Sequence, residues 1–454
     1  MFRKILIANR GEIALRIIRC CREMNIESLL VYSTEDRNSL PVMMATRAVC
    51  IGPAKAKESY LNQDAIIETA RKTGCDAIHP GYGFLSENAG FARKVRETGM
   101  VFIGPSPELI EKMGDKLAAR ALMKAHGIPV VPGSDGPVES AAEAREEADR
   151  IGYPVLIKAS AGGGGKGMRR VYSAAETGAA FEEARAEALA AFGNGELYLE
   201  KLIVSPRHIE VQILADHHGN VVELGERDCS LQRNNQKLLE EAPACGLTAG
   251  LRAQIRETAV RAAKAAGCDS AGTVEFILDK EGHFWFIEMN TRIQVEHPVT
   301  EEVTGTDLIR EQILAALGRR LSFSQDDITV KGHAIECRIN ALTPGKVNTL
   351  HLPGGFGVRV ESALFEGCAV SPCYDSMIAK IIVRGKNRRE AVRRLRRVLE
   401  EIIIDGVSTN AHLMYLLTYR RPFVCGGYST SFWPDIEEEL ESELARLAGS
   451  PDKL

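Results

Sequence analysis

The chain has 454 residues, enough for about three domains with buried cores, and its 57 basic and 61 acidic residues give a formal net charge of -4. This balance offers no global attraction to nucleic acid or to an anionic membrane, so binding to either is not expected. The 11 cysteines include no C-x-x-C pair, which argues against a disulfide scaffold or a zinc knuckle, and the apolar run Ile5–Ala8 is too short for a signal peptide or a membrane span, so we expect a cytoplasmic location.

The first part of the chain alternates strand-like and helix-like segments. Their patterns predict a strand at 4–8, a helix at 13–24, a strand at 28–32, a helix at 64–73 and a strand at 76–79. Alternation of this kind is typical of a parallel, doubly wound sheet. The turn at 9–12 has one glycine where a dinucleotide fingerprint needs three, so nicotinamide binding is not expected. The turn at 79–88 puts Tyr82 and Glu87 at the carboxyl end of a strand, where open α/β sheets bind ligands, although many such turns bind nothing.

A glycine-rich stretch follows in the middle of the chain. G-D-K at 114–116 opens a helix, 140–151 is helical, and the strand 153–158 leads into A-G-G-G-G-K-G-M at 161–168. Consecutive glycines free backbone N–H groups to approach phosphates. A P-loop would need Ser or Thr and then a helix after the lysine, whereas a glycine and a strand-like segment follow here. The pattern predicts a lid over a nucleotide or, alternatively, a flexible linker; Lys116 and Lys158 favour the lid, since lysine is a point-charge partner for phosphate.

Polar residues continue beyond this stretch. The strand 196–204 ends in backbone groups that could pair with an adenine edge. His208 and Glu210 share one face of the next strand, and Q-R-N-N-Q-K at 232–237 supplies Lys237. Taken singly, each of these side chains is more often a surface group than a ligand.

The segments 273–279 and 284–288 have hairpin spacing around a glycine-containing loop. If Asp279 pairs with Phe284, Glu275 falls directly opposite Glu288, and two like charges at that spacing destabilise a sheet unless a cation lies between them. The oxygen donors of Glu275, Glu288 and Asn290 suit Mg²⁺ or Mn²⁺. A shifted register would instead leave both glutamates in solvent.

Every second residue from 288 to 296 is polar: Glu288, Asn290, Arg292, Gln294 and Glu296. In an extended chain this spacing places all of them on one face. Two carboxylates, two amides and a guanidinium are more specific than the interchangeable polar residues of an ordinary strand, and we interpret the segment as the floor of an active site.

Several longer stretches together resemble biotin carboxylase, a member of the ATP-grasp superfamily. They are K-A-S-x-G-G-G-G-x-G-M at 158–168, P-R-H-I-E-V-Q at 206–212, E-R-D-C-S-L-Q-R at 226–233, E-E-A-P-A at 240–244, E-M-N-T-R-I-Q-V-E-H-P-V-T at 288–300 and G-H-A-I-E-C-R-I-N at 332–340. The resemblance extends to about Phe432. It implies mixed α/β and α+β architecture: a Rossmann-like pre-ATP-grasp domain at 1–113, an ATP-grasp domain at 114–330 with a mobile glycine-rich lid at 131–203, a C-terminal biotin carboxylase domain at 331–446 and a tail at 447–454.

The resemblance also implies a reaction. ATP phosphorylates bicarbonate to carboxyphosphate, whose carboxyl group then passes to biotin on a partner protein. The implied ATP site comprises Lys116, Lys158, Gly164, Gly165, Glu200, Lys201, Leu202, Ile203, His208, Gln232, Asn235, Glu275 and Glu288. Two Mg²⁺ or Mn²⁺ ions would be held by Glu275, Glu288 and Asn290. Bicarbonate would lie against Lys237, Arg292, Gln294, Val295 and Glu296, and biotin against Tyr82 and Arg338. The implied catalytic residues are Lys237, Arg292, Glu296 and Arg338.

Glu296 is the general base in this scheme. A carboxylate beside a bound anion gains proton affinity, whereas a metal would keep Glu288 ionised, so the chemistry favours Glu296. Arg338 lies on a strand with Glu336 and Asn340 and would stabilise the biotin enolate. Arg338 could instead form a structural ion pair with Glu336 or Glu296.

Two departures from the family pattern bear on binding. Asn235 stands where the family usually has His, a difference that would affect nucleotide affinity. The loop at 341–345 is shorter than is typical of the family, a difference that would affect docking of the carrier. The arginine-rich helix at 387–397 has apolar residues at helical spacing, which favours a solvated helix face over a nucleic-acid site, with docking of an acidic carrier as the second interpretation.

The partners also follow from the resemblance. No A-M-K-M segment occurs, so biotin is expected on a separate carboxyl carrier protein, with separate carboxyltransferase subunits. A homodimer is expected from residues that match the family's dimer contact: Arg16, Arg19, Glu23, Phe356 and Arg359. We expect the final acceptor to be acetyl-CoA, in malonyl-CoA formation for fatty-acid synthesis; pyruvate or propionyl-CoA are alternatives. The competing functions are those of a different ATP-grasp ligase and of a catalytically silent ATP-binding protein with a regulatory role.

Overall fold

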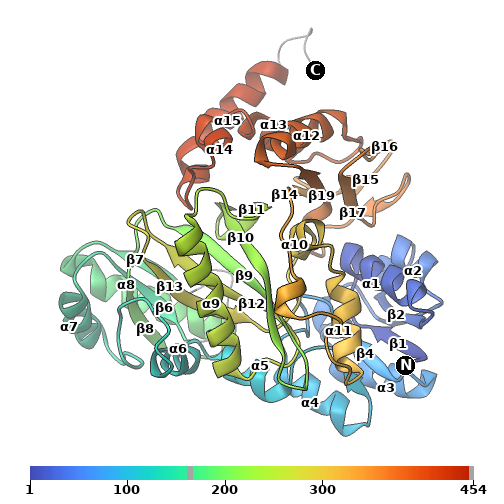
Figure 1. The fold of residues 1–454 in the computed structure, drawn as a ribbon, viewed down its shortest axis with the longest axis horizontal. Coiled ribbons are helices and arrows are strands. Elements are labelled where there is room, and N and C mark those ends of the chain that lie inside the picture. Colours follow the sequence, from blue (N-terminus) through green and yellow to red (C-terminus); the bar gives the residue numbers. More distant parts are fainter. Residues whose placement is uncertain (161–166, 449–454) are drawn as a thin grey trace.

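The computed structural model describes residues 1–160 and 167–448, and its N-terminal part is a five-stranded sheet flanked by helices (Figure 1). The strands have the order β3-β2-β1-β4-β5, and all neighbouring pairs are parallel. They are β1 (Lys4–Ile7), β2 (Glu27–Ser33), β3 (Arg47–Gly52), β4 (Ala77–His79) and β5 (Val101–Phe102), and the helices are α1 (Gly11–Glu23), α2 (Leu40–Met44), α3 (Gln63–Thr73), α4 (Ala89–Glu97) and α5 (Pro107–Gly114). The doubly wound sheet predicted from the alternation is confirmed.

Burial on both faces explains why β1 is apolar from Ile5 to Ile7. Ile5 and Ile7 pack with α1, whereas Leu6 packs on the opposite face with the side chains of α4. Parallel sheets need helices on both faces, so consecutive residues of their strands are all buried. The carboxyl ends of β1 and β4 carry the turns with Asn9 and Tyr82, which therefore lie at one edge of the sheet and face the rest of the molecule.

A smaller antiparallel sheet forms the lid region, which projects from one side of the molecule in Figure 1. Its strands have the order β7-β6-β8, and Lys158 pairs with Met168 on one side and Tyr198 on the other. The elements are β6 (Val155–Ala159), β7 (Met168–Val171) and β8 (Leu197–Lys201), with helices α7 (Ala141–Ile151) and α8 (Ala174–Phe192). The predicted strands on both sides of the glycine run are thus confirmed, while Gly164 and Gly165 lie outside the described residues.

An eight-stranded sheet forms the centre of the molecule, in the order β13-β12-β9-β10-β11-β14-β19-β17. Its strands are β9 (Arg207–Ala215), β10 (Val221–Arg233), β11 (Gln236–Ala242), β12 (Ala271–Leu278), β13 (Phe284–Asn290), β14 (His333–Asn340), β17 (Val358–Ser362) and β19 (Met377–Gly385). The pairing of β11 with β14 carries this sheet across the predicted boundary at 330/331, so the two units share backbone hydrogen bonds. The domain limits themselves stay a prediction.

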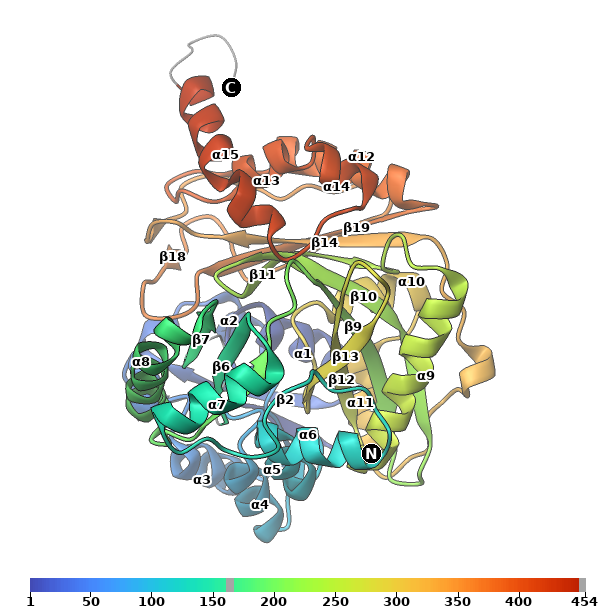
Figure 2. The same ribbon diagram turned by 90° about the vertical axis from the view of Figure 1, so that its left-hand side faces the viewer.

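Helices cover this sheet and join it to the other parts. They are α6 (Lys116–Ala125), α9 (Ala249–Ala266), α10 (His297–Thr304), α11 (Leu308–Ala316), α12 (Arg388–Glu401), α13 (Ala411–Leu417), α14 (Arg421–Cys425) and α15 (Phe432–Ala448). Figure 2 shows α12 to α15 above β14 and β19. Leu395 and Val398 of α12 are fully buried in that layer, and Arg389, Arg393 and Arg397 are exposed, as expected for a solvated face. Arg388 instead pairs with the buried Glu241 at 2.7 Å, so the interpretation holds for only part of the arginines. Short strand pairs, β15 (Gly345–Lys346) with β18 (Ala369–Val370) and β16 (Leu350–His351) with β20 (Ile403–Ile404), complete the C-terminal part.

The hairpin β12–β13 contains a β-bulge that brings its glutamates together. Near the turn, Leu278 pairs with Phe284, so the predicted pairing of Asp279 with Phe284 is wrong by one residue. The register shifts between Phe276 and Glu275, and Glu275 then lies opposite Glu288. Without the bulge, Ile287 would occupy that position and Glu288 would point to the other face, because side chains alternate along a strand. The predicted glutamate pair is therefore confirmed, although the bulge was not predicted.

Candidate active site

One cavity of about 1170 Å³ lies between the three sheets. Every predicted site residue that the structure describes lines this cavity, from Tyr82 of the N-terminal part to Arg338 on β14. The set is Tyr82, Lys116, Lys158, Glu200, Lys201, Leu202, Ile203, His208, Gln232, Asn235, Lys237, Glu275, Glu288, Asn290, Arg292, Gln294, Val295, Glu296 and Arg338. Residues separated by more than 200 positions thus share one enclosure, which is what a site for a large nucleotide and two smaller substrates requires.

The opposed carboxylates Glu275 and Glu288 each have a cationic neighbour. Lys116 Nζ lies 2.8 Å from Glu288 Oε2 and lowers the pKa of Glu288 to about 2. His208 Nε2 lies 3.0 Å from Glu275 Oε2 and Lys237 Nζ lies 3.1 Å from Oε1. Burial would raise the pKa of Glu275, but these two cations outweigh it and lower the pKa to about 2. Both carboxylates are therefore ionised at neutral pH.

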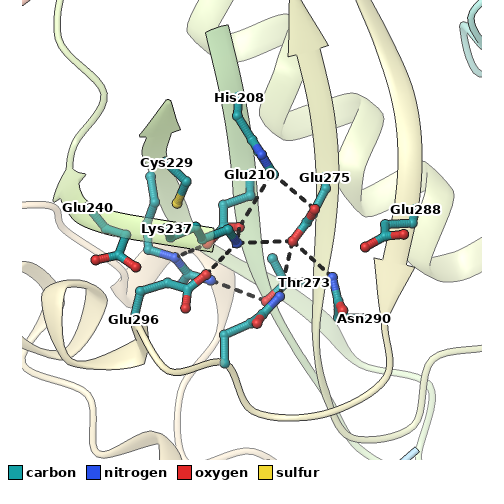
Figure 3. Close-up of polar contacts among 12 residues, drawn as sticks. His208, Glu210, Cys229, Lys237, Glu240, Thr273, Glu275, Glu288, Asn290 and Glu296 are labelled. Carbon is teal, nitrogen blue, oxygen red and sulfur yellow. Dashed lines mark hydrogen bonds and ion pairs between the residues drawn. The ribbon is translucent and has the colours of Figure 1, made fainter. Parts of the chain in front are cut away.

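Lys237 is the centre of the charge cluster (Figure 3). Its Nζ lies 2.6 Å from Glu210 Oε2, 3.1 Å from Glu275 Oε1 and 2.5 Å from Glu296 Oε1. Burial acts to lower the pKa of Lys237, but the three carboxylates raise it well above its ordinary value. One ammonium group therefore joins the carboxylate pair of the hairpin to the predicted general base.

Glu210 contacts Lys237 and also forms an ion pair with Arg227. Neither Glu210 nor Arg227 was predicted as a site residue. Arg227 is fully buried, and its Nε donates to Glu210 Oε1 at 2.5 Å while its other nitrogens donate to Gln212, Thr273 and Thr300. Burial opposes ionisation of Glu210, yet Arg227 and Lys237 lower its pKa to about 2. Glu210 lies in the stretch P-R-H-I-E-V-Q and Arg227 in E-R-D-C-S-L-Q-R. Their positions within these family-like stretches were the signal in the sequence that could have identified them as site residues.

The prediction of one extended segment from 288 to 296 is wrong beyond Asn290. Strand β13 ends there, and Glu296 is the N-cap of α10 with φ -80° and ψ 10°. Arg292 turns toward the N-terminal part, where its Nε donates to Glu87 Oε2 at 2.7 Å. Gln294 Nε2 donates to Glu275 Oε1 at 3.1 Å. The predicted residues therefore meet through tertiary contacts and not through strand alternation.

Glu296 is fully buried between two cations. Its Oε1 contacts Lys237, and its Oε2 accepts a hydrogen bond from Arg338 at 2.9 Å. Burial alone would raise the pKa of Glu296, but Lys237 and Arg338 lower it. The carboxylate is ionised and so able to accept a proton, while the raised proton affinity expected beside bicarbonate stays a prediction for the loaded site.

Arg338 bridges two acids at the other end of the cavity. Besides its contact with Glu296, its Nε donates to Glu240 Oε1 at 2.6 Å. The ion pair with Glu296 that the sequence left open is thus present, whereas neither oxygen of the buried Glu336 has a hydrogen-bond partner among the described residues. Burial raises the pKa of Glu240 to about 7 despite the neighbouring guanidinium. Tyr82 faces this end, and its hydroxyl donates to Glu12.

The predicted nucleotide residues lie at the lid side of the cavity. Lys158 is buried, and its Nζ donates to Glu200 Oε2 at 2.9 Å. Lys201 directs its Nζ to the carbonyls of Gly152 and Tyr153, so its backbone, and not its charge, is what faces the cavity edge. Gln232 Nε2 lies 2.9 Å from His208 Nδ1, and Asn235 occupies the turn before β11 with φ +62°.

The residues predicted at a dimer contact line a second cavity of about 460 Å³, apart from Phe356. Arg16 pairs with Asp307 at 2.6 Å and Arg19 with Glu361 at 3.0 Å. The side chain of Phe356 is 92% exposed. An exposed aromatic ring beside a mixed charged surface is compatible with a protein contact, and the homodimer stays a prediction.

Among the described residues, no helix combines the length and the apolar character needed to cross a membrane. Sequence models of three families match the chain. They are "Biotin carboxylase, N-terminal domain" at 1–110, "Carbamoyl-phosphate synthase L chain, ATP binding domain" at 115–324 and "Biotin carboxylase C-terminal domain" at 336–435.

Individual relatives are similar over nearly the whole chain. Biotin carboxylase 1 of Bacillus subtilis is 53% identical over 441 residues, covering 95% of this chain and 98% of that protein. A subunit of the pyruvate carboxylase of Methanothermobacter thermautotrophicus is 48% identical over 455 residues, covering 98% and 92%. A crystal structure of the biotin carboxylase domain dimer of Hydrogenobacter thermophilus 2-oxoglutarate carboxylase, in complex with MgADP, ADP and bicarbonate, superposes with a TM-score of 0.94 at 48% identity, covering 97% of this chain and 99% of that one.

Proposed function

The chain belongs to the biotin carboxylase family of ATP-dependent ligases, and we propose that it uses ATP and bicarbonate to carboxylate biotin on a separate carrier protein. The observation that carries this proposal is the position of Lys237, within 3.1 Å of both Glu275 and Glu296. A carboxylate suited to a metal–nucleotide complex and a carboxylate suited to proton transfer thus share one cation. That arrangement fits a reaction in which bicarbonate is phosphorylated and deprotonated at the same place.

Divalent metal ions fit the residues of the hairpin. Glu275 and Glu288 are ionised and lie opposite each other in the β12–β13 pairing. The amide nitrogen of Asn290 donates to Glu275 Oε1 at 2.9 Å, and its Oδ1 accepts a hydrogen bond from Arg292. The oxygen atoms of these three side chains are the hard, oxygen-only donor set that Mg²⁺ and Mn²⁺ prefer. We propose that these residues hold two such ions, which would neutralise charge on the transferred phosphoryl group.

The protein groups supply binding and proton transfer around that point. Lys116, Lys158 and His208 are proposed to bind the nucleotide phosphates, together with backbone N–H groups near Gly164 and Gly165. The residues from Glu200 to Ile203 would border the adenine, with Gln232 and Asn235 near the ribose.

Bicarbonate is proposed to lie against Lys237, Arg292, Gln294 and the backbone of Val295. Glu296 takes the bicarbonate proton as the anion attacks the γ-phosphorus atom. Arg338 and Tyr82 bind the biotin ureido group, and the guanidinium stabilises negative charge that develops on its oxygen.

We propose further that the chain works as a homodimer in the cytoplasm with a carboxyl carrier protein and carboxyltransferase subunits. Acetyl-CoA is the proposed final acceptor, for malonyl-CoA formation. The similarity to a subunit of a pyruvate carboxylase and to a 2-oxoglutarate carboxylase domain supports a half-reaction that is shared among acceptors. Pyruvate and propionyl-CoA therefore stay as alternatives, and identification of the biotinylated protein that co-purifies with the chain would decide among them.

The test is ATP cleavage measured with and without bicarbonate and free biotin. We expect phosphate release that requires bicarbonate and rises when biotin is added, and a Glu296→Gln variant that binds ATP but has lost this release. An ATP-grasp ligase with another acceptor would not respond to biotin, and a silent ATP-binding protein would release no phosphate. Either result would refute the proposed function.

A further inference from the structure

Lys380 on β19 is a buried lysine that none of the proposed steps uses. Its side chain has no exposed surface, and it does not line the cavity. On the sheet it lies between Arg338 of β14 and Glu361 of β17, its neighbours in the two pairings of β19. A fully buried ammonium group is strongly unfavourable unless it is paired and hydrogen-bonded, so its partners indicate what holds it there.

Those partners come from two other parts of the molecule. Lys380 Nζ donates to the backbone carbonyl oxygen of Val295 at 2.7 Å and lies 3.1 Å from Glu12 Oε1. The same oxygen of Glu12 accepts a hydrogen bond from the hydroxyl of Tyr82, and Glu12 Oε2 has no hydrogen-bond partner among the described residues. Burial acts to lower the pKa of Lys380, but Glu12, Glu336 and Glu361 raise it, so the group is charged.

The first contact orients the backbone that carries the general base. The carbonyl of Val295 belongs to the peptide group that joins it to Glu296, and peptide groups are planar. The hydrogen bond to that oxygen therefore fixes the orientation of the peptide plane that precedes Glu296, the N-cap of α10. This orientation directs the Glu296 carboxylate toward Lys237 and Arg338. If the peptide rotated, the carboxylate would swing away from both cations.

The second contact orients the biotin side of the cavity. The ring of Tyr82 lies 6.0 Å from Lys380 Nζ, and its hydroxyl shares Glu12 Oε1 with that ammonium. Glu12 lies in the first turn of α1, so this contact ties the N-terminal sheet to β19. Without the ammonium, the phenol would be the one partner left to the buried carboxylate of Glu12 among the described residues, and the position of the ring would be less firmly fixed.

We propose that Lys380 is a positioning residue that couples the biotin-binding phenol to the peptide of the general base. The proposal rests on the proposed function, since it assigns Tyr82 to biotin and Glu296 to proton transfer. The ammonium group of Lys380 makes two contacts, which we call its arms. The Glu12 arm affects biotin binding, and the Val295 arm affects the geometry of proton transfer. The arms predict different kinetic effects, which separates positioning from a general contribution to stability.

The experiment compares Lys380→Met, Lys380→Arg and Glu12→Gln, with the exposed Lys386→Met as a matched control. Bicarbonate-dependent ATP cleavage is measured over a range of free biotin concentrations, and MgADP affinity and the thermal midpoint report the fold. For Glu12→Gln we expect the KM for biotin to rise roughly tenfold with kcat nearly unchanged, because a neutral amide oxygen holds the phenol less firmly than a carboxylate while the Lys380–Val295 hydrogen bond is kept. For Lys380→Met we expect the same rise in KM and a fall in kcat of roughly tenfold or more, because the peptide of Glu296 is released as well.

Lys380→Arg keeps a donor for the Val295 carbonyl and should recover most of kcat. Combining Lys380→Met with Glu12→Gln should add little to the KM, because both changes act on the same arm. An unchanged KM for biotin in Glu12→Gln would overturn the proposal, even where Lys380→Met fails to fold. The proposal would also be overturned if Lys380→Met lowered the thermal midpoint and the affinity for MgADP and impaired the use of ATP, bicarbonate and biotin to the same extent, because that pattern indicates a general loss of stability. If the wild-type protein itself lacks bicarbonate-dependent, biotin-stimulated cleavage, the proposed function is refuted first, and the positioning role falls with it.

Discussion

Replacing Lys237 with methionine removes a cation that contacts three buried carboxylates. Methionine preserves most of the volume, so the change is mainly one of charge. Breaking a buried ion pair on one side generally destabilises a protein by about 3–5 kcal/mol, because the remaining charge stays in a poorly solvated place. The pKa values point to the same size of effect. Burial opposes ionisation of Glu210, but Arg227 and Lys237 lower its pKa from 4.5 to about 2.

A tenfold change in proton affinity is worth about 1.36 kcal/mol, so the net shift favours ionised Glu210 by about 3 kcal/mol. Arg227 and Lys237 together contribute more than this, because burial opposes them. Glu275 gains a similar amount from Lys237 and His208, since its pKa is also lowered to about 2. We therefore expect Lys237→Met to lower the free energy of unfolding by about 3 kcal/mol at pH 7.

The pH dependence has a defined sign. A carboxylate whose folded pKa is lowered contributes stability above its unfolded pKa, near 4.5, and loses it as the pH falls toward 2. In Lys237→Met the folded pKa values rise, so that contribution is already missing at pH 7. The difference between wild type and variant should accordingly stay nearly constant from pH 7 to about 4.5 and shrink as the pH is lowered from there toward 2.

Urea denaturation at pH 7 and at a series of pH values from about 4.5 downward measures both effects. Lys124→Met is the matched control, because Lys124 pairs with Asp135 at 2.7 Å on the surface, where the side chains are 63% and 81% exposed. Exposed pairs contribute little, so its midpoint should equal that of the wild type. If Lys237→Met also unfolds at the wild-type midpoint, or if its deficit grows as the pH falls, the account of this cluster is wrong.

Three further changes test other parts of the site. Burial raises the pKa of Glu240 to about 7, so its contribution to stability is lost as the pH rises from 4.5 through 7; Glu240→Gln should remove this loss, and thermal midpoints that keep the wild-type pH profile would contradict the assignment. Asn290→Ala removes an oxygen donor and should raise the Mg²⁺ concentration for half-maximal ATP cleavage roughly tenfold, whereas an unchanged magnesium titration would exclude this ligand. Phe276 is fully buried with its ring centroid 5.6 Å from that of Phe284; Phe276→Ala should lower the urea midpoint by an amount equivalent to about 3–5 kcal/mol, and a loss as small as that of an exposed residue would show that the hairpin is loosely packed.

The opposed glutamates could be predicted from the sequence because strand faces alternate with a fixed period of two. Given a hairpin, the pairing of Glu275 with Glu288 needs only a turn position. The bulge at Ile287 could not be predicted, because a single extra residue changes no propensity and depends on the packing of Phe276 and Phe286 beneath the strand. The predicted pairing at the turn was wrong by one residue, and the bulge shifts the register by one residue in the compensating direction. The two differences cancel, so the predicted pair of Glu275 and Glu288 is correct.

The segment after Asn290 shows where alternation misleads. Polar residues at every second position also occur in a chain that turns repeatedly, provided that other segments supply partners. Here Glu87, 205 positions away, accepts a hydrogen bond from Arg292, and Lys380 donates to the carbonyl of Val295. Contacts of such long range leave no periodic mark in the sequence, so the residues could be named while their backbone path could not.

The same reasoning explains why the supporting charges were missed. Buried charges depend on partners that the fold brings together, and Glu210, Arg227 and Lys380 look like ordinary polar residues within their own strands. In the folded chain the neighbouring cations keep Glu210, Glu275 and Glu288 ionised near neutral pH, as their pKa values of about 2 indicate. Metal ligands must be deprotonated, so the hairpin is ready for a divalent ion without releasing protons. In the proposed function, Lys116 would exchange Glu288 for a phosphate when the metal–nucleotide complex enters, since both partners are anions. The ion pairs around Lys237 therefore hold the carboxylates in the charge state that the proposed reaction needs.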